Sequence, residues 1–75
     1  LVDRKAVIVY LSLADNELTS LDRQAFIRFS ALEMLDLSNN KLQSLPTGLF
    51  EEQSKSLLAV SLRHNQLKTL PEDLI

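Results

Sequence analysis

The sequence predicts an α/β fold in which short parallel strands alternate with linkers that are turns, 3-10 helix or short helix. Three observations lead to this prediction. A 14-residue pattern occurs three times, each occurrence contains two apolar residues separated by one residue, and segments of ten and eleven residues join the occurrences. Apolar residues two apart point to the same side of a strand, and parallel strands need a crossover between them.

The repeated pattern has six apolar positions and one asparagine, written LxxLxLxxNxLxxL. It fits residues 8–21 (IVYLSLADNELTSL), residues 32–45 (LEMLDLSNNKLQSL) and residues 57–70 (LLAVSLRHNQLKTL). Apolar residues make up 45% of the chain, so chance does not explain six matching positions in all three copies. We therefore divide the chain into a tail at 1–7, repeats at 8–31 and 32–56, and a truncated repeat at 57–75.

The central LxL pair of each copy is expected to form the strand. In a repeat array each unit contacts its neighbours, so residues at the same phase stack in columns. The period of two then turns one set of side chains inward: Leu11 and Leu13, Leu35 and Leu37, Val60 and Leu62. The residues between and around them point outward.

One asparagine follows each strand, at Asn16, Asn40 and Asn65. Its amide supplies two donors and one acceptor, enough to satisfy backbone groups where the strand bends into the loop. We expect the three to form an interior ladder. The alternative is that they are ordinary surface turn formers.

The linkers are expected to differ from one another. Asp22 can cap a helix and apolar residues follow every three positions, so a helix is predicted over Asp22–Phe29. Pro46 and Gly48 favour a turn or 3-10 conformation in the second linker, and Pro71 favours the same in the third. Phe26 and Phe50 occupy the same phase of the repeat and are expected to be structural, with Val2 and Ile75 at equivalent positions.

These segments resemble the leucine-rich repeat family, and the 24-residue spacing with Phe26 and Phe50 resembles its typical extracellular subtype. The resemblance covers nearly the whole chain. It implies a right-handed solenoid fragment with a short parallel sheet on the concave face and the linkers on the convex face. The chain departs from the pattern at Asp22, where the other copies have proline, and at Gln53, where the first copy has Phe29.

Composition argues against several classes of function. Eight Lys and Arg against ten Asp and Glu give a net charge of -2 with mixed signs, which does not favour a nucleic-acid partner. The chain has no cysteine, one histidine, one glycine and no catalytic or phosphate-binding motif, so we expect no enzyme activity, metal or small-molecule cofactor. Its longest apolar run, residues 6–11, is far shorter than the roughly 20 residues of a transmembrane helix.

The outward face of the strands is the expected binding surface, because a rigid sheet presents a regular array of side chains there. The first candidates are Tyr10, Met34 and Leu58, since tyrosine and methionine are enriched in interface cores and all three add apolar area. Asp36, Arg63 and His64 are further candidates. His64 can equally be a solvated loop residue, and scattered exposed apolar residues are normal on any surface.

The predicted function is recognition of a protein ligand by part of a longer receptor or immune-type protein, secreted or at the cell surface. A cytoplasmic repeat protein is the alternative for location. For function, the alternatives are a structural spacer, an engineered scaffold, or a regulatory repeat attached to a catalytic domain elsewhere. Both ends fall at one phase of the repeat, so we also expect a piece of a longer array and head-to-tail association in isolation.

Overall fold

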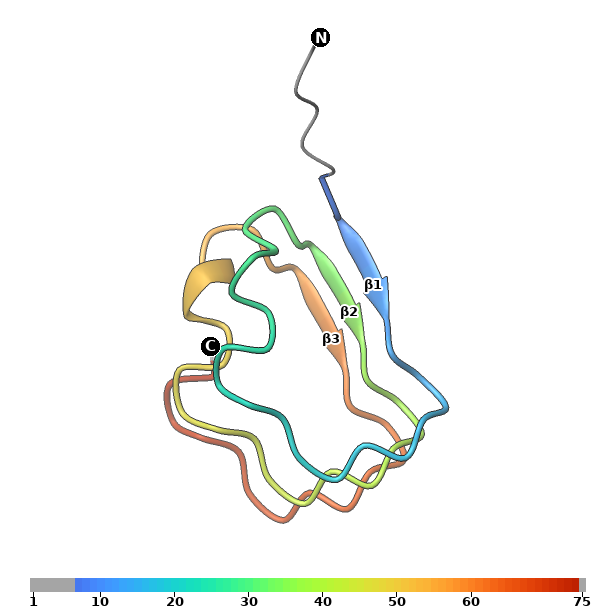
Figure 1. Ribbon diagram of the computed structural model, residues 1–75. Coiled ribbons are helices and arrows are strands. Elements are labelled where there is room, and N and C mark those ends of the chain that lie inside the picture. The colour runs from blue at the N-terminus through green and yellow to red at the C-terminus, as the bar shows by residue number, and fades with distance from the viewer. Residues whose placement is uncertain (1–6, 75) are drawn as a thin grey trace, which may run out of the picture.

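A computed structural model describes residues 7–74 of the chain. It contains the strands β1 (Tyr10–Ser12), β2 (Met34–Asp36) and β3 (Ala59–Ser61) and one 3-10 helix, η1 (Glu51–Gln53). The strands form one parallel sheet in the order β1-β2-β3, which confirms the predicted sheet. They lie along one side of the molecule and the linkers along the other (Figure 1).

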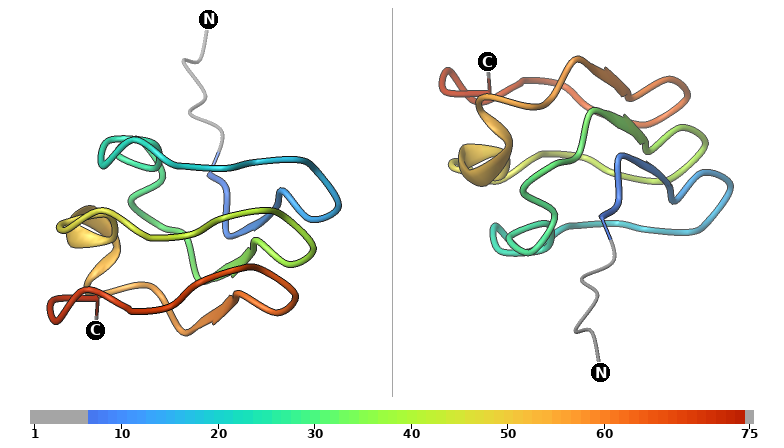
Figure 2. Two further views of the ribbon diagram at one scale, coloured as in Figure 1. Left: turned by 90° about the horizontal axis from the view of Figure 1, so that it is seen from below. Right: turned by 90° about the horizontal axis from the view of Figure 1, so that it is seen from above.

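The three passes of the chain lie in successive layers (Figure 2). We term residues 8–31, 32–56 and 57–74 the first, second and third coils. The expected positions of Val2 and Ile75, and the tail up to residue 6, lie outside the described residues.

The strand register follows the sequence repeat. Leu11 pairs with Leu35, and Leu35 pairs with Val60, so residues at the same phase are direct neighbours. The pairing continues beyond the strands, where the Leu13 amide donates to Asp36 O at 2.8 Å and the Leu37 amide donates to Ser61 O at 2.9 Å. A one-residue slip would turn every leucine outward, so the apolar columns fix the register.

Three residues after each strand, one residue has a left-handed backbone conformation. Asp15, Asn39 and His64 have φ angles of 60°, 57° and 58°. Asn, Asp and His are the non-glycine residues most often found in this region. The chain therefore reverses at the same phase of each coil by the same backbone device.

The core lies mainly in the second coil, because that coil is covered on both sides. The buried apolar residues are Phe26, Leu32, Leu35, Leu37, Leu42, Leu45, Leu49 and Phe50. Most of the equivalent leucines of the first and third coils are half-buried and pack against this cluster, as Leu11 and Leu62 do, whereas Leu70 is 53% exposed. The rings of Phe26 and Phe50 stack at a centroid distance of 6.1 Å and link the first two coils on the linker side.

The predicted helix over Asp22–Phe29 is wrong. The segment is a series of tight turns, in which amide groups bond to carbonyls three residues back, from Ala25 to Asp22 at 2.9 Å and from Phe29 to Phe26 at 3.0 Å. The Phe26 carbonyl accepts from the Phe29 amide and from the Gln53 side chain of the next coil, which holds the segment in these turns. Packing between coils therefore overrides the local helical pattern.

The second and third linkers have the turn-like geometry that their prolines predict. Residues 47–50 form a turn that leads into η1, and Gly48 has a φ of 79°. In the third linker the Leu74 amide donates to Pro71 O at 3.2 Å. The Gly48 amide donates to Asp73 Oδ2 at 2.9 Å, which ties the second linker to the third.

Candidate functional site

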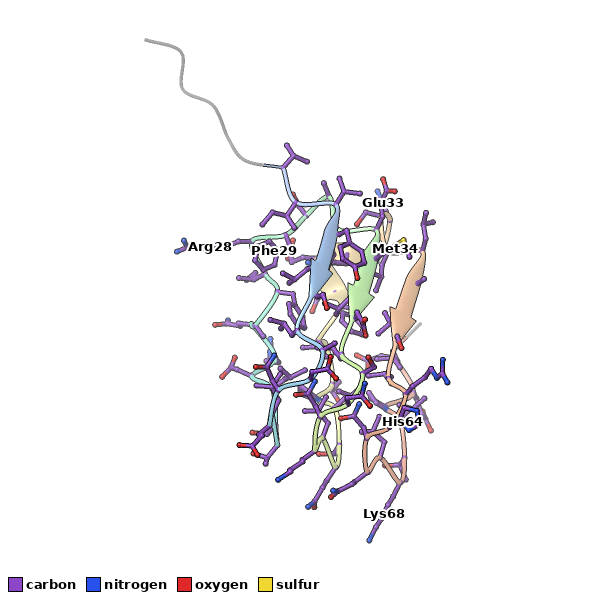
Figure 3. All side chains as sticks on the ribbon, turned by 90° about the vertical axis from the view of Figure 1, so that its right-hand side faces the viewer. Arg28, Phe29, Glu33, Met34, His64 and Lys68 are labelled. Atoms are coloured by element: carbon purple, nitrogen blue, oxygen red, sulfur yellow. The ribbon has the colours of Figure 1, made fainter. Side chains whose placement is uncertain are left out.

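The outward positions of the three strands form one continuous surface, which faces the viewer in Figure 3. We term it the strand face and define it by six strand residues and Leu58, which precedes β3. The six are Tyr10, Ser12, Met34, Asp36, Ala59 and Ser61. The sheet positions them because every second residue of a strand points away from the core.

The first row of the strand face is apolar. Tyr10 pairs with Met34, and Met34 pairs with Ala59. Tyr10 and Met34 are 58% and 49% exposed, and the neighbouring Leu58 is 78% exposed. The structure therefore brings three of the predicted binding residues to one end of the face, where they are open to contact.

The second row is polar and centres on Asp36, which lies between Ser12 and Ser61. The Ser38 hydroxyl and the Ser38 amide both donate to Asp36 Oδ1, at 2.6 and 2.9 Å. These two hydrogen bonds, the hydroxyl first, hold the pKa of Asp36 below its ordinary value against the opposing effect of desolvation. Asp36 is thus a fixed, ionised carboxylate at neutral pH.

A shallow hollow of about 210 Å³ joins the two rows. It is mostly apolar and open to solvent, and Asp36 forms part of its wall. Its lining consists of Tyr10, Met34, Leu35, Asp36, Ala59, Val60 and Ser61.

Arg63 and His64 lie beyond the end of β3 and do not join the apolar group. Both are exposed. His64 follows Ala59, the partner of Met34, by five residues, which corresponds to about 16 Å of extended chain. Figure 3 shows His64 beside the turn, far from Met34. A single ligand that contacts both would have to extend along the whole strand face.

The asparagines connect successive coils below the strands. The Asn40 amide nitrogen donates to Leu13 O at 3.0 Å and Leu37 O at 3.1 Å, and its oxygen accepts from the Leu18 amide at 3.1 Å. Asn65 repeats this pattern one coil later, with Leu37 O and the Leu42 amide. Asn40 is 6% exposed and Asn65 is half-buried.

Asn16 departs from the expected interior ladder. Its side chain is exposed, and its amide nitrogen donates only within its own coil, to Leu13 O at 2.9 Å and Ala14 O at 3.1 Å. The reason is positional, since no described coil lies on the outer side of β1 to bury it.

Gln53 has a role that sequence reasoning missed. It is fully buried, and its amide nitrogen donates to Phe26 O and to Phe29 O, at 2.6 and 3.1 Å. Its Oε1 atom has no hydrogen-bond partner among residues 7–74. The signal in the sequence was the polar residue at the phase of Phe29, which indicated altered linker geometry but not burial.

A second hollow, of about 710 Å³, touches the strand face only at its edge, at Leu58 and Ala59. It lies between η1 and the third coil, and most of its apolar wall consists of core-column residues such as Leu57, Leu62 and Leu70. Because these residues belong to the interior columns of the repeat, we assign the hollow to the packing of coils and keep the strand face as the candidate site.

The described residues contain no group of three or more acidic, histidine or cysteine side chains suited to hold a metal ion. Within the same residues, no helix has the length and apolar character needed to cross a membrane.

Together, the fold and the strand face define a repeat protein, in which each coil contributes one strand, one asparagine turn and one linker. The family model described as Leucine Rich Repeat matches residues 31–52. No solved structure matches the chain significantly.

Three curated relatives are similar over most of the chain. Leucine-rich repeat-containing protein 3 of Danio rerio is 35% identical over 87% of this chain and 24% of its own length. Leucine-rich repeats and immunoglobulin-like domains protein 2 of Homo sapiens is 38% identical over 81% of this chain and 6% of its own length. Tsukushi of Mus musculus is 45% identical over 77% of this chain and 16% of its own length.

The chain belongs to the leucine-rich repeat family. It spans about a quarter or less of each of these three relatives. None of the three names describes a catalytic activity.

Proposed function

We propose that the chain is a protein-recognition segment that binds a protein ligand on its strand face. The observation that carries the proposal is the contrast between the two sides of the sheet. Inward positions repeat the same aliphatic chemistry in every coil, as at Leu13, Leu37 and Leu62, whereas outward positions combine an apolar group with a fixed carboxylate. A rigid frame with chemically diverse exposed side chains is suited to recognise a partner surface.

The exposed apolar residues support the same proposal. Tyr10, Met34 and Leu58 lie together at one end of the strand face, where burial by a partner would stabilise a complex. The backbone of Tyr10 and Met34 is held in the sheet, so little backbone entropy is lost when these residues become covered. Arg63 and His64 extend the proposed surface at the opposite end.

We propose further that the chain is part of a longer right-handed solenoid of the typical extracellular subtype, with the strand face concave and the linkers convex. The repeat boundaries at residues 8–31, 32–56 and 57–75 belong to this proposal. A secreted or cell-surface location, in a receptor or immune-type protein, is supported by one relative whose name includes immunoglobulin-like domains, since such domains are common at cell surfaces.

The test is a binding screen of the 75-residue chain against an array of purified extracellular domains. A face variant combines Tyr10→Ser, Met34→Ser, Asp36→Asn and Arg63→Gln. A matched linker variant combines Asp22→Asn, Ile27→Ser and Arg28→Gln, which are exposed residues of similar chemistry on the other side of the coil.

We expect array signals of the wild type to disappear in the face variant and to persist in the linker variant, with both variants folded by circular dichroism. Signals that survive in the face variant would contradict the proposal and favour the alternative of a structural spacer.

A further inference from the structure

We propose that the protein partner presents a cationic side chain, lysine or arginine, to Asp36, with the aliphatic part of that side chain packed on Tyr10 and Met34. This inference rests on the proposed function, because it names the partner chemistry for the same strand face. It comes from three features of that face: one fixed charge, one available oxygen and one apolar hollow.

Asp36 is the only charged residue among the six strand positions of the face. It lies on the central strand, with Ser12 and Ser61 as its neighbours in register. A hydroxyl neighbour on each side leaves the negative charge uncompensated at the middle of the sheet. A partner that covers this face must either neutralise the charge or bear the cost of burying it alone.

The carboxylate of Asp36 is fixed, and one of its oxygens is available. Oδ1 accepts both bonds from Ser38, and Oδ2 accepts none from the residues that the structure describes. The one ion pair found in residues 7–74 joins Lys41 to Glu17, away from the strand face. Asp36 therefore presents an oriented acceptor without an internal cation. Because Ser38 already fixes its side chain, little further side-chain entropy is lost when a partner binds.

The hollow beside Asp36 fits the rest of a basic side chain. Tyr10, Met34 and Ala59 supply apolar wall, and Asp36 lies at one end. From Met34 to Asp36 the strand advances about 7 Å, which is comparable to the length of an extended lysine or arginine side chain. Basic side chains place apolar stems along such surfaces and keep the cationic head at a polar end. The Tyr10 ring adds a face that attracts cations.

Two neighbouring charges, Glu33 and Arg63, favour the same placement. Glu33 is exposed one residue before β2 and adds negative potential at the apolar end. Arg63 lies two residues beyond Ser61 and would repel a cation placed farther toward the turn, as would His64 when protonated. The partner cation is thus expected between Met34 and Asp36 rather than near the turn.

The experiment uses a random peptide library displayed on phage and selected on the 75-residue chain. Selected peptides are synthesised, and their affinities are measured for the wild type, Asp36→Asn and Asp22→Asn. Both substitutions remove one negative charge. Both also keep a side-chain oxygen that can accept a backbone hydrogen bond, from the Ser38 amide at position 36 and from the Gln24 amide at position 22. Asp22 lies on the linker side, so the second variant controls for net charge. Thermal melting of both variants checks that they remain folded.

We expect selected peptides to contain lysine or arginine beside apolar residues. Affinity should fall about tenfold or more in Asp36→Asn and change less than about twofold in Asp22→Asn. Added salt should weaken binding to the wild type more than binding to Asp36→Asn.

Peptides that lose affinity after Tyr10→Ser or Met34→Ser but ignore Asp36→Asn would overturn this inference and leave the proposed function intact. Peptides indifferent to every strand-face substitution, or a selection that yields none, would overturn both.

Discussion

Replacement of Asn40 by alanine tests how the coils are held together. Four hydrogen bonds depend on the Asn40 side chain, three donated by its nitrogen and one accepted by its oxygen. Because the residue is 6% exposed, water does not replace these bonds readily. The cost therefore depends on which of the four partners has another hydrogen bond.

Three of the four partners keep another hydrogen bond when the Asn40 side chain is removed. Leu13 O also accepts from Asn16, Leu37 O also accepts from Asn65, and Ser38 O also accepts from the Asp15 amide. The Leu18 amide has only the Asn40 oxygen at 3.1 Å among its described contacts. One half-buried donor without a partner costs roughly 1–3 kcal/mol, so we expect a loss of about 2 kcal/mol in the free energy of unfolding.

The assay is thermal and urea unfolding followed by circular dichroism, with Asn16→Ala as the matched control. Asn16 is exposed and bonds only within its own coil, so its loss should cost less than about 1 kcal/mol. For a chain of this size, 2 kcal/mol corresponds to a fall of roughly 8–16 °C in melting temperature. Equal melting temperatures for the two variants would show that Asn40 does not join the first coil to the second.

Two further predictions concern local geometry. Ser38→Ala removes the hydroxyl that bonds Asp36, so the pKa of Asp36, followed by NMR titration, should rise toward its ordinary value, and an unchanged pKa would contradict the assignment of cause. Because the pKa of Asp36 is lowered in the folded state, its hydrogen bonds with Ser38 stabilise the fold at neutral pH, and this stabilisation is lost as the pH falls below the ordinary aspartate value. The stabilisation should be smaller in Ser38→Ala. Gly48→Ala places a side chain at a φ of 79°, where its only close contact is an ordinary one to Glu51 at 3.5 Å. Backbone strain should therefore lower the free energy of unfolding by about 1–2 kcal/mol, measured by urea unfolding. An unchanged free energy would mean that the turn relaxes.

The sheet could be predicted because it depends on identical residues at fixed spacing. The offsets between Leu11, Leu35 and Val60 in the sequence are the offsets of the strand pairing. A buried column tolerates little variation in chemistry, so the same aliphatic residues recur at fixed spacing and the column can be recognised in the sequence. The turn-like second linker followed in the same way from Pro46 and Gly48, which restrict the backbone by themselves.

The first linker could not be predicted from its own residues. Asp22 does accept a bond from the Gln24 amide, as a helix cap would, and yet no helix follows. The outcome depends on Gln53 in the next coil, whose amide takes the Phe26 and Phe29 carbonyls. Gln53 lies 24 positions after Phe29 and 27 positions after Phe26. Contacts at such separations leave no signal within the linker, so its helical pattern cannot reveal them.

The candidate site was predicted by position more fully than by chemistry. Alternation along the strands placed Tyr10, Met34 and Asp36 outward. It did not reveal that Ser38 fixes Asp36, or that His64 adopts the same left-handed backbone conformation as Asp15 and Asn39. Both features require the turn geometry after the strand, which asparagine alone does not specify.

Recognition on the strand face can be tested by hydrogen exchange of the chain with and without a bound partner from the binding screen. We expect slower exchange in residues 9–13, 33–38 and 58–63 on binding, with residues 22–30 and 47–56 unchanged. Protection confined to those linker segments would contradict it.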